Sequence, residues 1–448
     1  MKPIERNKLI LFPSAVCNLN CTYCNISKNS ALKQIDNELE RFFQQPEEIL
    51  ARVKKYFHPA SLTTLEFWGG EPTLHIERVF NILQLLLNNY PYLNSFFLSS
   101  NFSYPGWERK IYDLLNQFRR FPNRYFNICL QLSCDGPEEL NDLGRGKNTT
   151  KKCLVNFQTL LKRLSEMLPD NVFLDFTLKP TLSIETFKLL NTKEKIISYY
   201  RFFENNFWNP VVELNSPNIK FWLHTPNMGV PCPATIQDGR DFAQFCKDCD
   251  ELSRESEKYF QYYKDVRPFS ISSQHHSGSE TYYGFARPCG IGNCTVGLLP
   301  NNKISVCHEG FTQLLKEYRQ YQLTETGAST IEKHISRAQH YNLCYTEEEY
   351  DDFEDLMCSY CYQGGVAHTV SLVAQIRLLA YAGQILPEYK QEVNALHAAH
   401  ALTNECNCFK DNYNVSGSFT LRPVGLMRLL LNGALPYVEG TNDISARK

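Results

Sequence analysis

The sequence predicts an α/β protein: a partial (β/α)6 TIM barrel with a cysteine-rich, mostly helical C-terminal extension. In the first 225 residues, short apolar runs alternate with helical stretches of ten or more residues, which is typical of parallel βαβ units. Five or six such units indicate a full or partial barrel, in which the loops after the strands carry the chemistry. From about residue 238 the alternation stops, and residues 267–310 become rich in Gly, Ser, Pro, Asn and Cys.

The expected strands and helices follow one another along the first half of the chain. The strands are Lys8–Phe12, Thr64–Trp68, Ser95–Ser99, Phe126–Leu132, Val172–Leu178 and Ile219–His224. The helices are Glu47–Tyr56, Ile76–Asn89, Trp107–Phe118, Lys152–Met167 and Ile184–Asn206. Apolar residues alternate in Val172–Leu178, as in a strand with one buried face, whereas Ile76–Asn89 is strongly apolar throughout. Trp107–Phe118 follows Pro105-Gly106, which suits a helix start.

The second half of the chain is organised differently. Asp238–Val266 is charged and aromatic and is expected to be helical, as are residues 366–382, 390–402 and 422–431. We therefore expect three parts. They are the barrel core at residues 1–235, a helical connector at residues 236–285 and a cysteine-rich region with C-terminal helices at residues 286–448.

Composition excludes several classes of protein. The 448 residues carry a formal net charge of −2, which does not favour a nucleic-acid partner. The apolar run Leu9–Phe12 is too short for a signal peptide, and no stretch reaches about 18 apolar residues, so we expect no membrane span and a cytoplasmic location. A reducing cytosol disfavours disulfides, and the 17 cysteines therefore indicate metal or redox chemistry.

Three cysteines lie close together after the first expected strand. Cys17, Cys21 and Cys24 fall within eight residues, and soft thiolate ligands suit an iron–sulfur centre. Three ligands leave one iron of a [4Fe–4S] cluster with an open position, as a catalytic metal centre requires. The alternatives are a structural zinc site with a distant fourth ligand, or three incidental cysteines.

This CxxxCxxC segment resembles the signature of the radical S-adenosylmethionine (SAM) superfamily. The resemblance implies that the open iron chelates the amino and carboxylate groups of SAM and that Tyr23 packs near the adenine. It also implies that one electron from the cluster cleaves SAM to methionine and a 5′-deoxyadenosyl radical. That radical removes a hydrogen atom from an unreactive C–H bond.

A second match follows the second expected strand, at Gly69, Gly70, Glu71 and Pro72. Glycines allow backbone carbonyls to approach a ligand closely, and carbonyls together with a carboxylate can accept from an ammonium group. The resemblance implies that this segment binds the SAM amino group. The alternative for this segment is a simple turn.

A third match is the stretch from Ser133 to Pro137, followed by Asn141-Asp-Leu-Gly-Arg145. It is similar to the S-x-D-G-P…H-D-x-x-R stretch of sulfatase-maturase-like and peptide-modifying radical SAM enzymes, with Asn141 in place of His. The resemblance implies that Ser133 hydrogen-bonds SAM and that Arg145 approaches an anionic group; the alternative for Arg145 is a surface salt bridge. Asn101 ends the third strand, where relatives carry a T-N-G-like segment that faces SAM.

A second group of cysteines resembles the SPASM/twitch extension, which carries auxiliary iron–sulfur clusters. Its members are Cys289, Cys294, Cys307, Cys344, Cys358 and Cys361. A hairpin is expected just before Cys307, where Asn302 replaces the usual Gly and tolerates a left-handed turn conformation. The pattern then departs from the family, because Ala367 stands where the next cysteine belongs. We therefore expect one auxiliary [4Fe–4S] cluster, with a structural zinc site as the alternative.

The leading hypothesis is a radical SAM enzyme that modifies a peptide or protein side chain by oxidation, crosslinking or thioether formation. It would need an electron donor such as flavodoxin or ferredoxin. The chain begins at the barrel, so a leader peptide would be bound by the C-terminal region or by a separate peptide-recognition partner. The alternatives are a radical SAM enzyme acting on a small molecule, or a non-catalytic iron–sulfur or zinc protein. The sequence does not identify a catalytic acid or base.

Overall fold

The computed structural model describes most of the first 223 residues and two short segments of the C-terminal region. The described residues are 6–24, 26, 32–223, 227, 228, 237, 240, 241, 244, 245, 248, 249, 251, 252, 295–305 and 344–346. In this part of the chain, no helix is both long and apolar enough to span a membrane.

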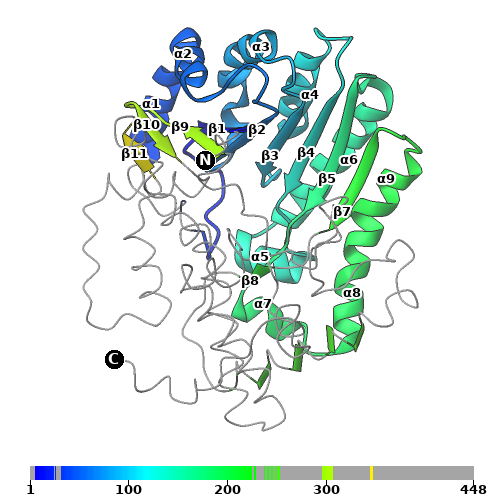
Figure 1. Ribbon diagram of the computed structural model, residues 1–448. Helices are drawn as coiled ribbons and strands as arrows, with labels where there is room; N and C mark the ends of the chain where they lie inside the picture. Colours follow the sequence, from blue (N-terminus) through cyan, green and yellow to red (C-terminus); the bar gives the residue numbers. More distant parts are fainter. Residues whose placement is uncertain are drawn as a thin grey trace, which may run out of the picture.

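Six parallel strands form most of the sheet and lie side by side in the order in which they occur in the chain (Figure 1). They are β1 (Lys8–Ser14), β2 (Thr64–Gly69), β3 (Ser95–Ser100), β4 (Phe126–Leu132), β5 (Val172–Leu178) and β7 (Ile219–Leu223). Each strand pairs in parallel with the next, and helices connect them. This confirms the predicted α/β partial barrel.

The helices of the described region are α1 (Leu32–Phe43), α2 (Pro46–Tyr56), η1 (Pro72–Val79), α3 (Phe80–Asn89), α4 (Trp107–Phe118), α5 (Glu138–Arg145), α6 (Thr149–Met167), α7 (Ile184–Leu189), α8 (Lys193–Phe203), η2 (Glu204–Trp208) and α9 (Asn209–Glu213). They lie in two places relative to the strands. Most of them run beside the strands, whereas the short helices α5 and α7 lie beyond the ends of the strands (Figure 1). A two-residue pair, β6 (Thr181–Leu182) with β8 (Asn227–Met228), lies near them.

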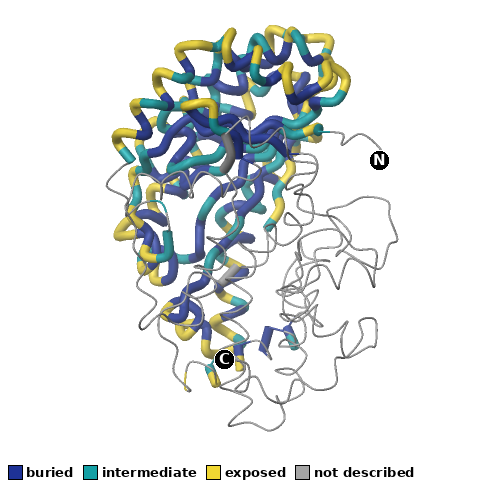
Figure 2. Tube along the Cα trace, turned by 60° about the vertical axis from the view of Figure 1, so that its left-hand side comes forward, coloured by how far each residue is buried: buried dark blue, intermediate teal, exposed yellow. Residues whose placement is uncertain are grey.

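The core lies between the sheet and the helices that cover it. In β5, Val172, Leu174, Phe176 and Leu178 are all buried, and the alternate residues lie on the opposite face of the sheet. Phe157 of α6 meets Phe176 with ring centroids 5.0 Å apart. Figure 2 shows the same division, with buried residues along the strands and exposed residues on the outer faces of the helices. Burying each such aromatic side chain stabilises the fold by about 1.5–3 kcal/mol.

Some predicted helices have different boundaries in the structure. The predicted helix Ile184–Asn206 is divided into α7 and α8, and its last residues lie in η2. The second helix starts afresh because the Thr192 hydroxyl accepts from Lys195 N and caps it. The predicted helix Ile76–Asn89 begins earlier, as η1, and bends at His75, whose φ is −128°. Helices α1, α5 and α9 were not predicted.

The C-terminal strands extend the same sheet beyond β1 (Figure 1). β9 (Thr295–Leu298) pairs in parallel with β1, and β10 (Lys303–Ser305) and β11 (Cys344–Thr346) follow as antiparallel neighbours. Asn301 and Asn302 have φ values of 57° and 55°, as a tight hairpin turn requires. This confirms the predicted hairpin and the left-handed conformation of Asn302. The three-part division of the chain stays a prediction.

The turn of this hairpin is held against α2. Arg52 donates from Nη1 to Leu299 O and from Nη2 to Lys303 O, both at 2.9 Å. Asn301 Nδ2 also donates to Glu38 Oε2 of α1 at 3.0 Å. The start of the C-terminal region is therefore fixed to the barrel through both a strand pairing and these side chains.

Candidate functional site

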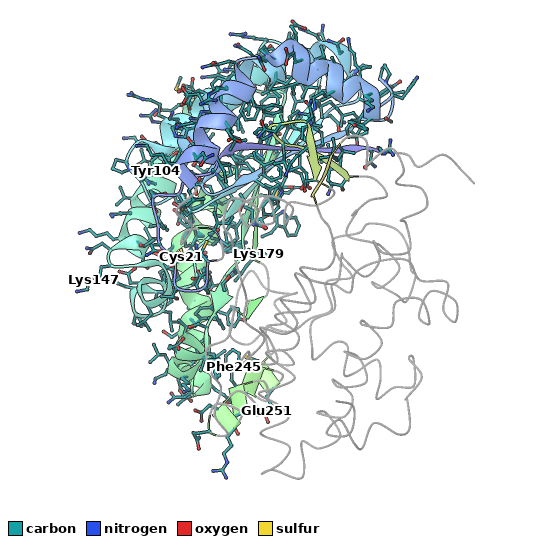
Figure 3. All side chains as sticks on the ribbon, turned by 90° about the vertical axis from the view of Figure 1, so that its left-hand side faces the viewer. Cys21, Tyr104, Lys147, Lys179, Phe245 and Glu251 are labelled. Carbon is teal, nitrogen blue, oxygen red and sulfur yellow. The ribbon has the colours of Figure 1, made fainter. Side chains whose placement is uncertain are left out.

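The cysteine loop is the segment from Ala15 to Cys24, and it follows β1 at the C-terminal ends of the parallel strands. In a parallel barrel this end is where the loops that carry chemistry meet. Figure 3 shows Cys21 at the same end of the barrel as Lys179, the residue that follows β5. The loop, the end of β2, the end of β3 and helix α5 together form the candidate site.

The start of the loop lies directly against the end of β2. Gly70 N donates to Ser14 O at 2.9 Å, and Glu71 N donates to Val16 O at 2.8 Å. A Cβ on Gly69 would lie 2.2 Å from Ser14 O, and one on Gly70 would lie 2.3 Å from Ala15 O. The glycines are therefore required for packing, since any side chain would push the cysteine loop off β2.

This packing role differs from the one that the sequence indicated. The sequence analysis assigned Gly69 and Gly70 to the close approach of a ligand, whereas the neighbouring atoms in the structure are carbonyls of the chain's own loop. Contact between this segment and a SAM amino group stays a prediction.

The three thiols of the loop lie in a partly buried environment. Cys21 is 8% exposed, and Cys17 and Cys24 are of intermediate exposure. Burial, assisted by the negative charge of Glu71, raises the pKa of the Cys17 thiol to about 12, and burial raises the pKa of Cys21 to about 11. Both thiols are therefore protonated at neutral pH in the metal-free chain. Binding a metal would displace those protons.

Hydrogen-bond donors point at two of these sulfurs. Leu19 N lies 3.4 Å from Cys17 Sγ, and Ile26 N lies 3.4 Å from Cys24 Sγ. Donors placed in this way stabilise negative charge on the sulfurs, as an iron–sulfur cluster requires. Among the described residues, no three His, Cys, Asp or Glu side chains converge as ligands of a single metal ion. A [4Fe–4S] cluster does not need such convergence, because each thiolate binds a different iron.

Glu71 is buried and fastens the end of β2 to the end of β3. Its Oε1 accepts from Thr73 N at 3.2 Å, from the Thr73 hydroxyl and from Ser100 Oγ at 2.8 Å. Its Oε2 accepts from Asn101 N at 2.6 Å. Burial raises the pKa of Glu71 above its usual value, although these hydrogen bonds oppose the rise. The carboxylate thus has a structural task in addition to the predicted contact with SAM.

Asn101 lies between β3 and the cysteine loop. Its Nδ2 donates to Cys17 Sγ at 3.4 Å and to Asn18 Oδ1 at 2.9 Å. The sequence analysis expected Asn101 to face SAM; the structure shows it in contact with a predicted cluster ligand.

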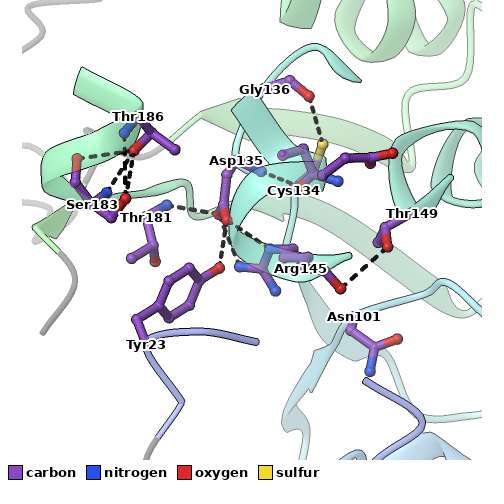
Figure 4. Close-up of polar contacts among 12 residues, drawn as sticks. Tyr23, Asn101, Cys134, Asp135, Gly136, Arg145, Thr149, Thr181, Ser183 and Thr186 are labelled. Carbon is purple, nitrogen blue, oxygen red and sulfur yellow. Dashed lines mark hydrogen bonds and ion pairs between the residues drawn. The ribbon is translucent and has the colours of Figure 1, made fainter. Parts of the chain in front are cut away.

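Tyr23 and Arg145 meet at Asp135, as Figure 4 shows. Arg145 donates from Nε to Asp135 Oδ2 and from Nη2 to Asp135 Oδ1, both at 2.9 Å, and the Tyr23 hydroxyl donates to the same carboxylate. The Arg145 guanidinium carbon also lies 5.5 Å from the centre of the Tyr23 ring. Thr181 N donates to Asp135 Oδ1 at 2.9 Å, so every lone-pair direction of this buried carboxylate is in use.

The Asp135–Arg145 pair is an ion pair inside the protein, not on its surface. The two side chains are 1% and 7% exposed. Burial by itself would lower the pKa of Arg145, but the charge of Asp135 holds that pKa well above its usual value. The alternative for Arg145, a salt bridge on the surface, is therefore wrong, because the pair is buried. An approach of Arg145 to an anionic group of SAM stays a prediction.

The remaining predicted residues lie at the end of β4. Ser133 is of intermediate exposure, and its side chain makes no hydrogen bond to the described residues, which leaves it available for the predicted contact with SAM. Asn141, which replaces the family's His, is fully buried and accepts from Asp135 N at 2.8 Å. Asn141 therefore supports Asp135 from behind.

Two contributors to the site were not predicted. Asp135 is the centre of the polar network, and Gly144 lies so close to Tyr23 that an added Cβ would be 2.8 Å from Tyr23 Cε1. The carboxylate in the quoted Ser133–Pro137 stretch was a signal for Asp135. Gly144 gave no signal, because its requirement arises only from the packing of α5 against the loop.

Most of the auxiliary cysteines lie outside the described residues. These are Cys289, Cys294, Cys307, Cys358 and Cys361. The backbone of Cys344 forms the first residue of β11 and pairs with Ser305. The auxiliary cluster therefore stays a prediction.

A protein-family model described as "Radical SAM superfamily" matches residues 11–187. The match runs from β1 into α7. It includes the cysteine loop, the ends of β2, β3 and β4, and the Asp135–Arg145 pair.

A curated protein from Methanocaldococcus jannaschii, provisionally named a glycyl-radical enzyme activating enzyme, is 30% identical over 87 residues. Those residues are 19% of this chain and 22% of the archaeal protein, so the chain matches less than a quarter of that relative's length.

Two crystal structures of Streptococcus suis SuiB are similar to this chain. The first has 14% identity and a TM-score of 0.37, and covers 72% of this chain and 64% of SuiB. The second, bound to S-adenosylmethionine, has 13% identity and a TM-score of 0.34, and covers 67% and 58%.

Proposed function

We propose that this chain, whose residues 11–187 match the radical SAM superfamily model, is an enzyme that cleaves S-adenosylmethionine reductively. It would use the resulting 5′-deoxyadenosyl radical to remove a hydrogen atom from a peptide or protein side chain. The observation that carries the proposal is the cysteine loop itself. It presents three thiols at the C-terminal end of a parallel barrel, with N–H donors directed at Cys17 and Cys24. A family match without such a site would support the fold alone.

The residues of the loop would hold the cofactor. Cys17, Cys21 and Cys24 would bind a [4Fe–4S] cluster, which supplies the electron for the cleavage. The Tyr23 ring is fixed by its hydroxyl contact with Asp135 and by Arg145 above it, so it offers a preformed surface for an aromatic base. Ser133, a residue of intermediate exposure at the end of β4, would offer its hydroxyl as a hydrogen-bonding group to the same ligand.

A peptide or protein substrate is the favoured class. The support is the similarity of the Ser133–Pro137 stretch and Arg145 to peptide-modifying relatives, together with a charge balance that does not favour nucleic acid. Flavodoxin or ferredoxin would supply the electron, and a separate peptide-recognition partner would present a leader peptide. A radical SAM enzyme acting on a small molecule is the alternative within the same chemistry.

A second candidate substrate follows from the archaeal relative. Its provisional name describes an activating enzyme for glycyl-radical enzymes, and it shares 30% identity with this chain over 87 residues. In that case the hydrogen would be removed from a glycine in a folded partner enzyme. A short peptide and a folded protein are distinguished by incubating the enzyme with each and locating the modified residue by mass spectrometry.

The test of the proposed function is SAM cleavage under anaerobic conditions. The chain is reconstituted with iron and sulfide, reduced with dithionite and incubated with SAM, and 5′-deoxyadenosine is measured by chromatography. The control carries Cys17→Ala, Cys21→Ala and Cys24→Ala together. We expect product only from the wild-type chain. If the wild-type chain, with its cluster formed, releases none even with candidate peptides, the proposal is wrong.

The same triple variant tests for the auxiliary cluster. We propose that one [4Fe–4S] cluster is bound by Cys289, Cys294 and Cys307, with a fourth ligand from Cys344, Cys358 or Cys361. Iron and sulfide should then remain in the triple variant, at about half the wild-type content if each site holds one cluster. Zinc in place of iron would support the structural alternative.

A further inference from the structure

Asn101 donates a hydrogen bond to the sulfur of Cys17. Its Nδ2 lies 3.4 Å from Cys17 Sγ, and the residue is 6% exposed. The backbone of Asn101 is also fixed, because Asn101 N donates to the buried Glu71 carboxylate at 2.6 Å. The donor is therefore held in place from two sides and is shielded from water.

The orientation of the Asn101 amide follows from its neighbours. Its Oδ1 accepts from Ser103 N at 3.1 Å and from Ser103 Oγ at 2.8 Å. Because a backbone N–H can only donate, the amide oxygen must face Ser103. The NH2 group then necessarily faces Asn18 Oδ1 and Cys17 Sγ. Asn18 completes this hydrogen-bond network by donating from Nδ2 to Ser103 Oγ at 3.0 Å.

A donor at a cluster sulfur affects the reduced state more than the oxidised state. When a [4Fe–4S] cluster gains an electron, negative charge on its thiolates grows, and N–H groups directed at the sulfurs stabilise that charge. Leu19 N provides one such donor to Cys17. Asn101 adds a second donor from a side chain, which can be changed by mutation.

We propose that Asn101 is a positioning residue that raises the reduction potential of the cluster by donating to Cys17 Sγ. The inference rests on the proposed function in one respect, namely that Cys17 binds the cluster. It adds a role that differs from the SAM contact expected from the sequence. Reduction of the cluster by a physiological donor becomes easier because the electron-rich state is stabilised at this sulfur.

The experiment measures the midpoint potential of the reconstituted cluster in the full chain. Asn101→Ala removes the donor. Asn101→Asp keeps the size of the side chain and the oxygen that accepts from Ser103, but directs a carboxylate oxygen at the sulfur. The matched control is Asn156→Ala: Asn156 is also buried and donates to Phe102 O at 2.9 Å and Tyr104 O at 2.8 Å, so it supports the same turn without contacting Cys17.

Each protein is titrated with dithionite, and the reduced cluster is followed by electron paramagnetic resonance. We expect both Asn101 variants to keep their iron and sulfide. The equilibrium constant for one-electron reduction should fall on the order of tenfold in Asn101→Ala, a shift of about 59 mV to more negative potential. The shift should be larger in Asn101→Asp, and Asn156→Ala should keep the wild-type potential.

Several outcomes would overturn the inference. These are an unchanged potential in both Asn101 variants, an equal shift in Asn156→Ala, or loss of the cluster from both Asn101 variants while Asn156→Ala keeps it; the last result would make Asn101 an assembly residue. Failure of the wild-type chain to form any cluster is a separate result, because it refutes the proposed function together with this inference.

Discussion

The two ends of the cysteine loop are held to the barrel in different ways. At the first end, Ala15 N donates to Asp36 Oδ1 at 2.8 Å, and the carbonyls of Ser14 and Val16 accept from the end of β2. At the second end, Thr22 N donates to Gly144 O at 2.9 Å, and Tyr23 contacts a single buried ion pair. The first end is thus supported by contacts spread over several elements, and the second by one concentrated network.

The difference indicates how each end responds to mutation. Each of the hydrogen bonds at the first end stabilises the fold only a little, since a typical hydrogen bond contributes about 0.5–1.5 kcal/mol net. A buried ion pair is different, because removing one partner leaves the other charge buried and unpaired. A single substitution in the ion pair should therefore destabilise the second end of the loop. The first end should be lost only when a substitution displaces the backbone itself.

The largest expected effect is that of Asp135→Ala. The substitution leaves the Arg145 guanidinium buried without its partner, removes the acceptor of the Tyr23 hydroxyl, and should lower the free energy of unfolding by about 3–5 kcal/mol. Chemical denaturation of the metal-free chain measures this. The control is Glu77→Ala, which breaks the Lys110–Glu77 pair at 2.6 Å, where the side chains are 33% and 47% exposed, and should cost less than about 1 kcal/mol. Similar losses in both variants would contradict the comparison.

The same contrast explains what the sequence could predict. The strands Phe126–Leu132 and Val172–Leu178 and the helix Trp107–Phe118 have the predicted boundaries, because their apolar residues repeat with the period of the element that they form. The first end of the loop was also recognised, since Gly69 and Gly70 follow a strand directly. The physical reason for these two glycines was not recognised, because a clash with a loop far away in the sequence leaves no local pattern.

The contacts at the second end of the cysteine loop could not be predicted from local sequence patterns. Asp135 and Arg145 are ten residues apart, a spacing that no single helix or strand brings together. The pair forms because Gly136, with φ of +138°, turns the chain into α5, whose last residue is Arg145. Helix α5 was missed because it is only eight residues long and buries polar side chains such as Asn141 as well as apolar ones. The parallel pairing of β9 with β1 was missed for a related reason, since it joins distant segments of the chain.

The next largest effect concerns the first end and isolates the clash at β2. Gly69 and Gly106 both have positive φ, of 132° and 80°, but only Gly69 has backbone atoms where a Cβ would lie. Both alanine variants therefore incur the strain of a positive φ, and Gly69→Ala, which adds the clash with the loop, should lose about 1–3 kcal/mol more in the free energy of unfolding. Iron content after reconstitution should fall in Gly69→Ala and stay at the wild-type value in Gly106→Ala. Equal losses of stability and of iron in the two variants would mean that the cysteine loop moves aside for the alanine at position 69 without a cost in free energy.

The smallest expected effect tests the spread contacts through their dependence on pH. Burial by itself would raise the pKa of Asp36, but Arg78, whose Nη2 donates to Oδ2 at 3.0 Å, and the Ala15 amide lower it below its usual value. His75 Nε2, 3.8 Å from the same oxygen, acts in the same direction when protonated. An acid with a lowered pKa in the folded state adds stability above its unfolded pKa, and that stability is lost as the pH falls through the folded pKa.

Asp36→Asn should accordingly lower the free energy of unfolding by about 1 kcal/mol at pH 7, because the amide keeps an acceptor for Ala15 but loses the charge. The difference between wild type and variant should shrink once the pH falls below about 4, where the carboxylate of the unfolded chain becomes protonated. Denaturation of the metal-free proteins between pH 3 and pH 7 measures it. A difference that stays constant over this range would show that the charge of Asp36 does not support the first end of the loop, whose remaining contacts would then be backbone and neutral hydrogen bonds.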